Sequence, residues 1–387
     1  MGSGGAHGFL KHSAHLNPHI SRSGAIPSLK AWKRLSTTTL AFGLAALAGF
    51  SGAAYHIPLA WMLGPLLVAA CLSAAGFDLR PNENVRKFGQ LTIGTAVGLT
   101  MTASVLAELG GWLPLMVLSA LVSVMMSCVA GVILARQARL DQKTAFFASL
   151  PGGLAEMGNI GVQMGAQAEP IAIVHTLRVT IVALTIPSIL LAFGTPDFAV
   201  APGTRIVDPY WTVGLIVGGA AFAYLLGRIR LNNPYMIGAI LFTAIFASRG
   251  LVAGKMYHPL FAVAQLMIGF SVGCRFRRDI LAKLPRVAFF SVISIFGLGT
   301  VMVGFALLLS LRTGLPYPAA ILATSPGGLS EMTVTAEILH LAVPTVVGFQ
   351  VVRGILVNSL ASHYYALLTR YGVLGFLQSV FGSSEPG

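Results

Sequence analysis

Long apolar segments separated by short polar breaks follow a polar N-terminal tail. The segments cover 37–55, 57–76, 88–107, 112–135, 144–165 and 170–194 in the first half, and 211–227, 234–253, 259–274, 287–311, 317–338 and 343–368 in the second. A helix needs about 20 apolar residues to cross a bilayer. The segments also lack the alternation of a half-buried strand. The pattern therefore predicts an all-α integral membrane protein, a polytopic helical bundle.

The composition argues in the same direction. Of the 387 residues, 55% are hydrophobic and 10% are charged, whereas soluble domains carry about 25% charged residues. So few charges could not cover the surface of a soluble globule of this size. We therefore expect neither a water-soluble enzyme nor a nucleic-acid binder.

The polar breaks divide the chain into five parts. Residues 1–35 are predicted to form a basic, flexible N-terminal tail, and residues 371–387 a C-terminal tail. Residues 36–194 and 211–370 form two membrane repeats, which residues 195–210 connect.

The second membrane half is a copy of the first. The stretch Pro-Gly-Gly-Leu-Ala-Glu-Met at 151–157 recurs as Pro-Gly-Gly-Leu-Ser-Glu-Met at 326–332, displaced by 175 residues. The same displacement relates Gln90 to Gln265, Gly94 to Gly269, Gly98 to Gly273 and Arg178 to Arg353. Because these positions are spread over most of each half, they indicate an internal duplication.

The distribution of basic residues predicts that the two copies are inverted. Lysine and arginine favour cytoplasmic loops, so the basic tail places the N-terminus in the cytoplasm. If each half crosses the membrane an odd number of times, nineteen of the 25 Lys and Arg residues become cytoplasmic. About five crossings per half, with a broken or re-entrant Pro-Gly-Gly segment, satisfy this parity. The net charge of +13 then reflects topology rather than nucleic-acid binding.

The duplicated motif predicts a helix break at membrane depth. Its break residues are Pro151, Gly152 and Gly153, and Pro326, Gly327 and Gly328. Proline removes a donor and glycine permits unusual backbone angles. Irregular backbone persists in a membrane only where protein covers it or where it lines a watery cavity. Secondary transporters use such breaks in inverted repeats to hold solutes; the alternative is a proline kink with close glycine packing.

Each motif carries a glutamate, Glu156 or Glu331, and an arginine follows 22 residues later, Arg178 or Arg353. Intramembrane charges are costly and mark functional sites with a partner nearby. We therefore expect each glutamate to pair with the arginine of its half. Such a pair could be structural, or it could form a proton- or cation-coupled site. The arginines could instead hold an anionic solute by a two-pronged contact.

Other polar positions have open roles. His175 lies one turn before Arg178, where the second half has Gln350, so the copies differ. His175 is either a proton relay or a satisfied buried polar group. Gln90 and Gln265 face protein or cavity, and a site role and a structural role both remain open.

The small residues around these glutamines are interpreted as packing positions. Gly94 and Gly98, and Gly269 and Gly273, have the Gly-x-x-x-Gly spacing that lets helices approach closely.

No motif predicts an enzyme, a metal or a cofactor. Glu337 and His340 form one Glu-x-x-His, whereas a di-iron bundle needs two with further carboxylates. The Gly-x-Ser-x-Gly hydrolase motif is missing. The three cysteines, Cys71, Cys128 and Cys274, lack zinc or disulfide spacing. The expected partners are the lipid bilayer and a small-molecule solute, without direct nucleic-acid contact.

Three features carry a family resemblance: the Pro-Gly-Gly-Leu-x-Glu-Met pair, the downstream arginines, and the Met-x-Gly stretches at 62–64 and 236–238. With these features the sequence resembles the AbrB family of bacterial inner-membrane proteins. The resemblance covers nearly the whole chain after the tail. It implies a multi-pass protein of the bacterial inner membrane, with one AbrB duplication in each half. Members are labelled regulators of gene expression or ammonia monooxygenases, and the second label disagrees with the missing metal ligands.

Together these features predict a secondary-transporter-like carrier of a small solute, which is anionic if the arginines contact it. The alternative class is a membrane-embedded regulator of gene expression that acts indirectly, by sensing or signalling. A membrane monooxygenase is a third alternative.

Opposed halves give a direct test of topology. Single cysteines at Ala201 and Arg277 should react with a membrane-impermeant thiol reagent from opposite sides, with position 277 on the cytoplasmic side. Labelling of both positions from one side would contradict the inverted arrangement.

Overall fold

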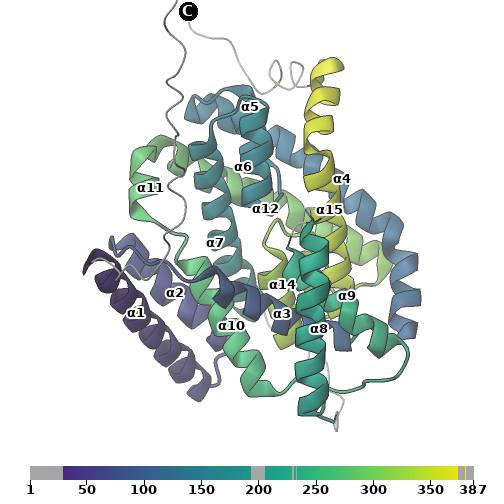
Figure 1. The fold of residues 1–387 in the computed structure, drawn as a ribbon. Coiled ribbons are helices and arrows are strands. Elements are labelled where there is room, and N and C mark those ends of the chain that lie inside the picture. The colour runs from purple at the N-terminus through teal and green to yellow at the C-terminus, as the bar shows by residue number, and fades with distance from the viewer. Residues whose placement is uncertain (1–28, 193–204, 229–230, 232, 374–379, 381–387) are drawn as a thin grey trace, which may run out of the picture.

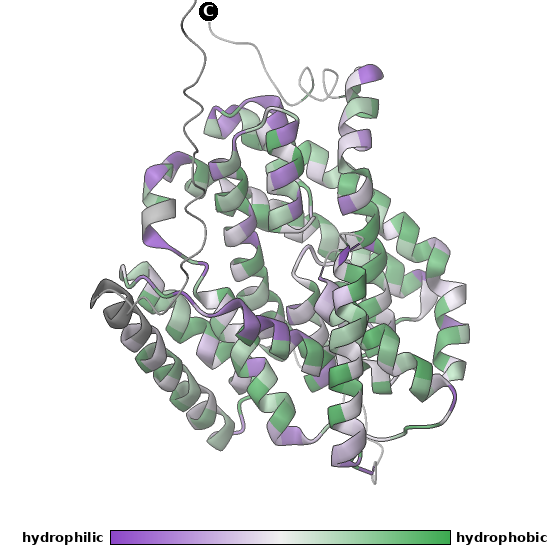
Figure 2. Cartoon of the chain, viewed as in Figure 1, coloured by the Kyte–Doolittle hydropathy of each residue, from purple (hydrophilic) through white to green (hydrophobic). Residues whose placement is uncertain are grey.

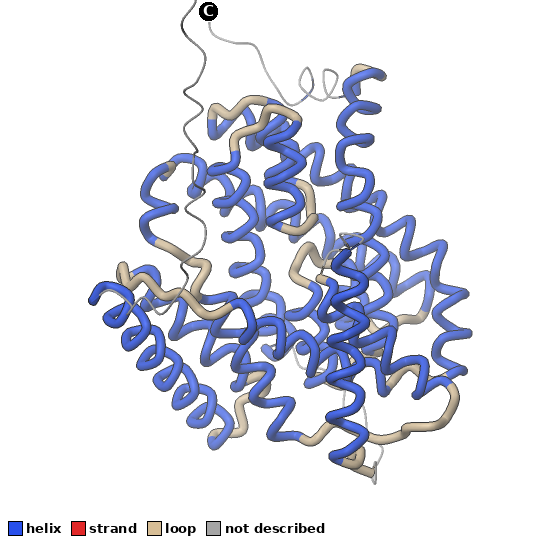
Figure 3. Tube along the Cα trace, viewed as in Figure 1, coloured by secondary structure: helices blue, strands red, loops and turns tan. Residues whose placement is uncertain are grey.

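A computed structural model describes residues 29–192, 205–228, 231, 233–373 and 380, and the regular elements within them are helices (Figures 1 and 3). The first half contains α1 (Leu29–Ala54), α2 (Ala60–Ala74), α3 (Glu83–Leu99), α4 (Ala103–Ala138), α5 (Gln142–Ser149), α6 (Leu154–Gln163) and α7 (Ala168–Ala192). The second half contains α8 (Pro209–Arg228), α9 (Pro234–Ser248), α10 (His258–Gly273), α11 (Arg278–Lys283), α12 (Pro285–Thr313), α13 (Tyr317–Thr324), α14 (Leu329–Ile338) and α15 (Val343–Arg370). Most of both expected tails, and position 201, lie outside the described residues.

Six of the described helices are long and apolar enough to cross a membrane, namely α1, α4, α7, α8, α12 and α15. Apolar side chains also face outward: on α1, Leu40, Leu44, Leu47 and Phe50 are more than half exposed. Hydrophobic colour accordingly covers much of the helical surface in Figure 2. Water would not tolerate such a surface, whereas lipid would. The architecture is therefore compatible with a membrane helical bundle.

The helix bounds repeat with the spacing of the sequence motif. Helices α3, α5, α6 and α7 have counterparts in α10, α13, α14 and α15 that begin 175 residues later. One element differs, because α4 is continuous whereas its counterpart stretch is divided into α11 and α12. The division falls at Leu284, which has φ −133° and ψ 67°. Leu284 precedes Pro285, and the proline ring disfavours helical backbone at the residue before it.

Helix α4 also begins earlier than the apolar segment that predicted it. The segment was expected to cover 112–135, whereas the helix begins at Ala103. The Thr102 side chain caps this start by accepting from the Val105 N–H at 3.4 Å. Pro114 lies inside the helix without ending it, as membrane helices tolerate.

The helices form two packed groups, each built from both halves. The short-helix group contains α1, α2, α3, α8, α9 and α10, and the broken-helix group contains α4 to α7 and α11 to α15. In Figure 1, α1, α2, α8, α9 and α10 lie in the lower part and α5, α6 and α11 in the upper part.

The packed pairs within each group are interchangeable between halves. Helix α3 packs on α9, and its counterpart α10 packs on α2. Likewise, α4 packs on α15, and its counterpart α12 packs on α7. Exchanging the halves leaves these pairs unchanged, as an approximate two-fold relation between them would.

The two Gly-x-x-x-Gly pairs lie where α3 meets α9 and where α10 meets α2. A Cβ at Gly94 would lie 2.6 Å from the carbonyl oxygen of Met236, and a Cβ at Gly269 would overlap a carbonyl oxygen of α2. Gly98 and Gly273, one turn later, meet α9 and α2 in the same way. The helix backbones therefore approach at distances that only glycine allows.

Replacing Gly269 with alanine should destabilise the short-helix group by about 1–3 kcal/mol, because the added methyl forces the α10 and α2 backbones apart. Unfolding of the purified protein in detergent measures the loss. Gly111→Ala is the matched control, since nothing lies within 4 Å of the Cβ it would add. Equal stability of the two variants would contradict the packing role.

Candidate functional site

Both Pro-Gly-Gly motifs interrupt a helix inside the broken-helix group. Helix α5 ends at Ser149 and α6 begins at Leu154, while α13 ends at Thr324 and α14 begins at Leu329. The residue before each proline is extended; Leu150 has φ −57° and ψ 135°. Proline disfavours helical backbone at the preceding residue and cannot donate to the previous turn. Each helix therefore stops and restarts after the glycines.

The first broken segment returns to the end where it begins. The backbone N–H of Gln167, just before α7, donates to Thr144 Oγ1 at 2.8 Å, and the Gln167 side-chain amide donates to Asp141 Oδ2 at 3.3 Å. Asp141 is itself the N-cap of α5 and accepts from the Thr144 N–H at 2.9 Å. The start of α7 thus lies beside the start of α5, so α5 and α6 form a hairpin.

Arginines cap the carbonyl ends of the interrupted helices. Arg178 Nη1 donates to the carbonyl of Leu150 at 2.7 Å, and its Nη2 donates to that of Gly152 at 3.1 Å. Arg353 caps the second break in the same way, and its Nη2 donates to the carbonyl of Gly327 at 3.1 Å. The last carbonyls of a helix have no intrahelical donor. A guanidinium carries five N–H donors in a planar fork and can satisfy several of them at once.

The glutamate–arginine pairs expected from the sequence are not formed. Among the ion pairs of the described residues, none joins Glu156 or Glu331 to Arg178 or Arg353. The physical reason is that each break leaves buried carbonyls, whose desolvation is costly without a donor. The arginines donate to these carbonyls and therefore do not pair with the glutamates. Those acceptors belong to the backbone, so the spacing of charged side chains could not reveal them.

His175 and Gln350 serve equivalent positions. His175 Nδ1 lies 3.1 Å from Arg178 Nη2, and its Nε2 lies 3.0 Å from the carbonyl oxygen of Phe147. Gln350 Oε1 accepts from Arg353 at 2.6 Å, and its Nε2 donates to a carbonyl of α13 at 2.7 Å. Each side chain therefore links its arginine to the preceding half-helix. Because both ring nitrogens are engaged, the geometry favours a positioning role for His175.

The two glutamines have different surroundings. Gln90 Nε2 lies 3.4 Å from both Asn233 Oδ1 and Ser330 Oγ, and so links α3 to α9 and α14. Gln265 is buried, and its Oε1 has no hydrogen-bond partner within the described part of the chain. The first half carries Leu and Ala at the positions equivalent to Asn233 and Ser330, which leaves Gln265 without these contacts.

Asn358, which the sequence analysis did not single out, crosses between the halves. It lies on α15, and its Oδ1 accepts from the backbone N–H of Gly153 at 2.9 Å. A second-half side chain therefore holds the first-half break. The sequence did offer a signal for Asn358, because it is an amide side chain inside an apolar run. Polar residues within membrane segments are candidate functional positions by default.

A cavity of about 520 Å³ lies between the short-helix and broken-helix groups. Both breaks contribute to its wall, together with parts of α3, α7, α9, α10 and α15. Its basic lining residues are Arg86, Lys87, Arg178, Arg275 and Arg353, and its acidic lining residues are Glu83, Glu156 and Glu331. Cationic side chains therefore outnumber anionic ones around the cavity.

Glu156 and Glu331 occupy the third position of α6 and α14 but differ in burial. Glu331 is 6% exposed, whereas Glu156 is half-buried. The difference follows from packing: α14 contacts α3 and α10, and no comparable packing joins α6 to either helix. The two-fold relation is thus broken at the cavity. Among the described residues, no three His, Cys, Asp or Glu side chains gather as metal ligands.

Replacing Arg353 with glutamine should destabilise the protein by about 2–4 kcal/mol, because buried carbonyls lose their charged donor. Denaturant unfolding in detergent measures the change. Arg370→Gln, at the exposed end of the same helix, is the control and should have little effect. Similar losses in the two variants would argue against a capping role for Arg353.

Comparison with known proteins places most of the chain in one family. The family model "Transition state regulatory protein AbrB" matches residues 61–369. The chain is 29% identical over 353 residues to "Uncharacterized protein YhjN" of Bacillus subtilis, covering 84% of this chain and 91% of that protein. It is 28% identical over 308 residues to "Putative regulator AbrB" of Escherichia coli, covering 78% and 87%. No solved structure matches it. The chain belongs to the AbrB family.

Proposed function

We propose that this protein is a secondary transporter of a small anionic solute, which binds in the cavity between the two helix groups. One observation carries the proposal: two interrupted helices, α6 and α14, begin at the same cavity, and its lining has more cations than acids. A helix N-terminus offers free N–H groups and a positive dipole end, which favour anions. Secondary transporters hold solutes at such discontinuous helices.

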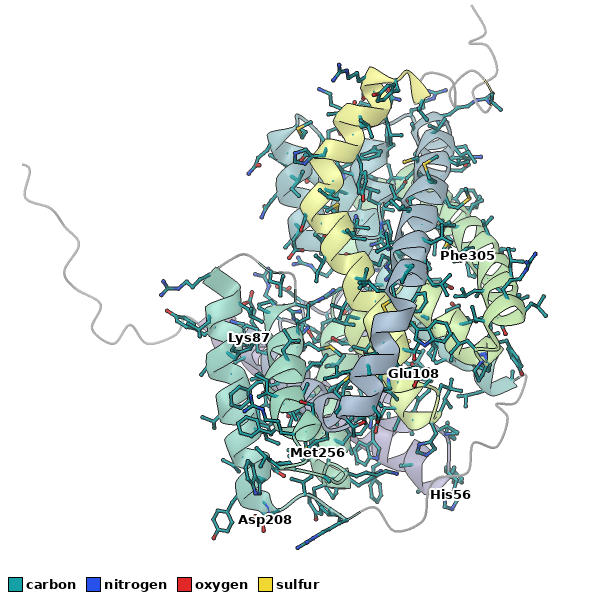
Figure 4. The ribbon with its side chains drawn as sticks, turned by 90° about the vertical axis from the view of Figure 1, so that its right-hand side faces the viewer. His56, Lys87, Glu108, Asp208, Met256 and Phe305 are labelled. Carbon is teal, nitrogen blue, oxygen red and sulfur yellow. The ribbon has the colours of Figure 1, made fainter. Side chains whose placement is uncertain are left out.

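In this proposal the two halves are inverted across a bacterial inner membrane, with the N-terminus in the cytoplasm. The parity of the basic loops supports the inversion, and the interchangeable helix pairs fit a two-fold relation between the halves. Figure 4 shows His56, Met256 and Asp208 toward the lower end of the molecule, below Lys87. The basic-residue rule assigns the connections of the first three to the outer side and the start of α3, which carries Lys87, to the cytoplasm.

The cavity is proposed to open to the cytoplasm in this conformation. Arg86 and Lys87 at the start of α3, and Arg275 just after α10, line it. The basic-residue rule assigns both of these helix ends to the cytoplasmic side. Helix α14 is packed against the short-helix group, whereas α6 is not. In a protein with two-fold related halves, α6 would pack against the short-helix group while α14 separates from it. This exchange would close one side of the cavity and open the other. Such an exchange is the motion that alternating access requires.

The printed name of the Escherichia coli relative favours a second candidate, a membrane regulator that senses a solute and affects transcription indirectly. Both functions use the same cavity, and they differ in whether the solute crosses the membrane. Neither candidate requires an enzyme activity.

The double replacement Glu156→Gln and Glu331→Gln should abolish uptake of the transported solute into proteoliposomes, measured with a panel of radiolabelled small anions. Both side chains line the cavity, and a glutamine cannot take up or release the proton that a coupled carboxylate would exchange. Gel filtration and thermal unfolding should show the variant folded. Glu108→Gln, at an exposed position of α4, should transport normally.

Equal uptake by the wild type and the double variant across the panel would contradict the transporter proposal. If no solute is transported, and removal of the basic N-terminal tail alters transcription, the regulator is the better account.

A further inference from the structure

The carboxylate of Glu331 folds back over the N-terminus of its own helix. A Cβ at Gly328, the N-cap of α14, would overlap Glu331 Oε2 and lie 3.3 Å from Oε1. The first N–H groups after this cap, those of Leu329, Ser330 and Glu331, have no intrahelical acceptor. No side-chain cap satisfies them at Gly328. A carboxylate thus already occupies the region where a helix favours an anion.

This carboxylate is buried and has no hydrogen-bond donor among the described side chains. Glu331 is 6% exposed and lines the cavity. Its charge does act on Arg275, which follows α10: burial lowers the pKa of Arg275, Arg86 lowers it further, and Glu331 raises it. A buried charge with one such partner is costly and marks a functional position.

The other charged side chains around α14 lie on α3, α7 and α15, and most of them already have a hydrogen-bond or salt-bridge partner. Helix α3 carries Glu83, Arg86 and Lys87, and the Lys87 Nζ lies 3.7 Å from a Glu83 carboxylate oxygen. Helix α7 carries His175 and Arg178, and α15 carries Arg353; all three bond to backbone carbonyls. Glu331 is therefore the carboxylate in this wall that is buried without a salt bridge among the described residues.

We propose that a small solute carboxylate displaces the Glu331 carboxylate from the α14 N-terminus, and that Glu331 then takes up a proton, so that one proton is carried with each solute anion. This inference rests on the proposed function. The solute carboxylate takes the place of the Glu331 carboxylate beside the α14 N-terminus, and a proton from water joins a Glu331 oxygen. No covalent bond of the solute changes.

Repulsion between the two carboxylates supports the coupled proton. If the solute carboxylate and Glu331 both stayed ionised in one wall of the cavity, their like charges would repel, and a neighbouring like charge favours the protonated form of a carboxyl group. Burial of an unpaired charge in a low-dielectric region is costly, and neutralisation relieves it. Proton uptake restores the net charge that the cavity carries without solute.

The equivalent position in the first half does not offer a second proton site. Glu156 is half-buried, so water can solvate its charge. The N–H of Gly153, the N-cap of α6, is already bonded to Asn358. The expected stoichiometry is therefore one proton per anion rather than two.

Isothermal titration calorimetry of the full-length protein in detergent tests this coupling. Acetate, pyruvate and succinate serve as probes, each titrated in buffers of different ionisation enthalpy so that the protons taken up per bound anion can be counted. The wild type should take up one proton. Its affinity should fall about tenfold per pH unit wherever the free Glu331 is ionised, because one linked proton gives that slope.

Glu331→Gln should bind the same probe with no proton uptake and no pH dependence, while Glu108→Gln, at an exposed position outside the cavity, should keep both. Wild-type binding without proton uptake overturns this inference and leaves the transporter proposal standing. Wild-type transport of another anion, with no binding of any of the three carboxylates, overturns the carboxylate assignment. Absence of transport for every solute overturns the proposed function itself. If Glu331→Gln does not fold, the wild-type proton count decides.

Discussion

Two helices stop inside the helical bundle, and their last carbonyl groups have no donor within their own helix. Arg178 and Arg353 meet this need, and the rest of the cavity depends on them. With the carbonyl ends satisfied, the restarted helices α6 and α14 can begin at the cavity wall. His175 and Gln350 orient the two guanidiniums through different side chains in the same place. The geometry is thus preserved between the halves although the residues differ.

Sequence periodicity predicted the helical architecture and the place of each break, because both follow from local chemistry. Apolar length marks the spans, and a Pro-Gly-Gly stretch within an apolar segment prevents a continuous helix. The partners of the arginines were predicted wrongly because their acceptors are backbone carbonyls, which every residue type carries. Asn358 and the burial of Glu331 also escaped prediction, since each depends on how α15 or α14 packs on a distant helix. The orientation of the halves across the membrane stays a prediction.

The departure from two-fold symmetry is as informative as the symmetry. Equivalent helices pack on equivalent partners within each group, yet only α14 is packed on α3 and α10 in the described structure. One acid is consequently buried and the other half-exposed. The asymmetry therefore reflects how the two groups meet, and the sequences of the two motifs, which are nearly identical, do not determine it.

The bond from Asn358 to Gly153 has a consequence for biosynthesis. The acceptor lies on α15, whereas the donor lies in a hairpin that the ribosome synthesises about two hundred residues earlier. The first hairpin therefore lacks this bond until α15 has been made. A chain that stopped before α15 would contain the complete first half and still leave its break without this partner.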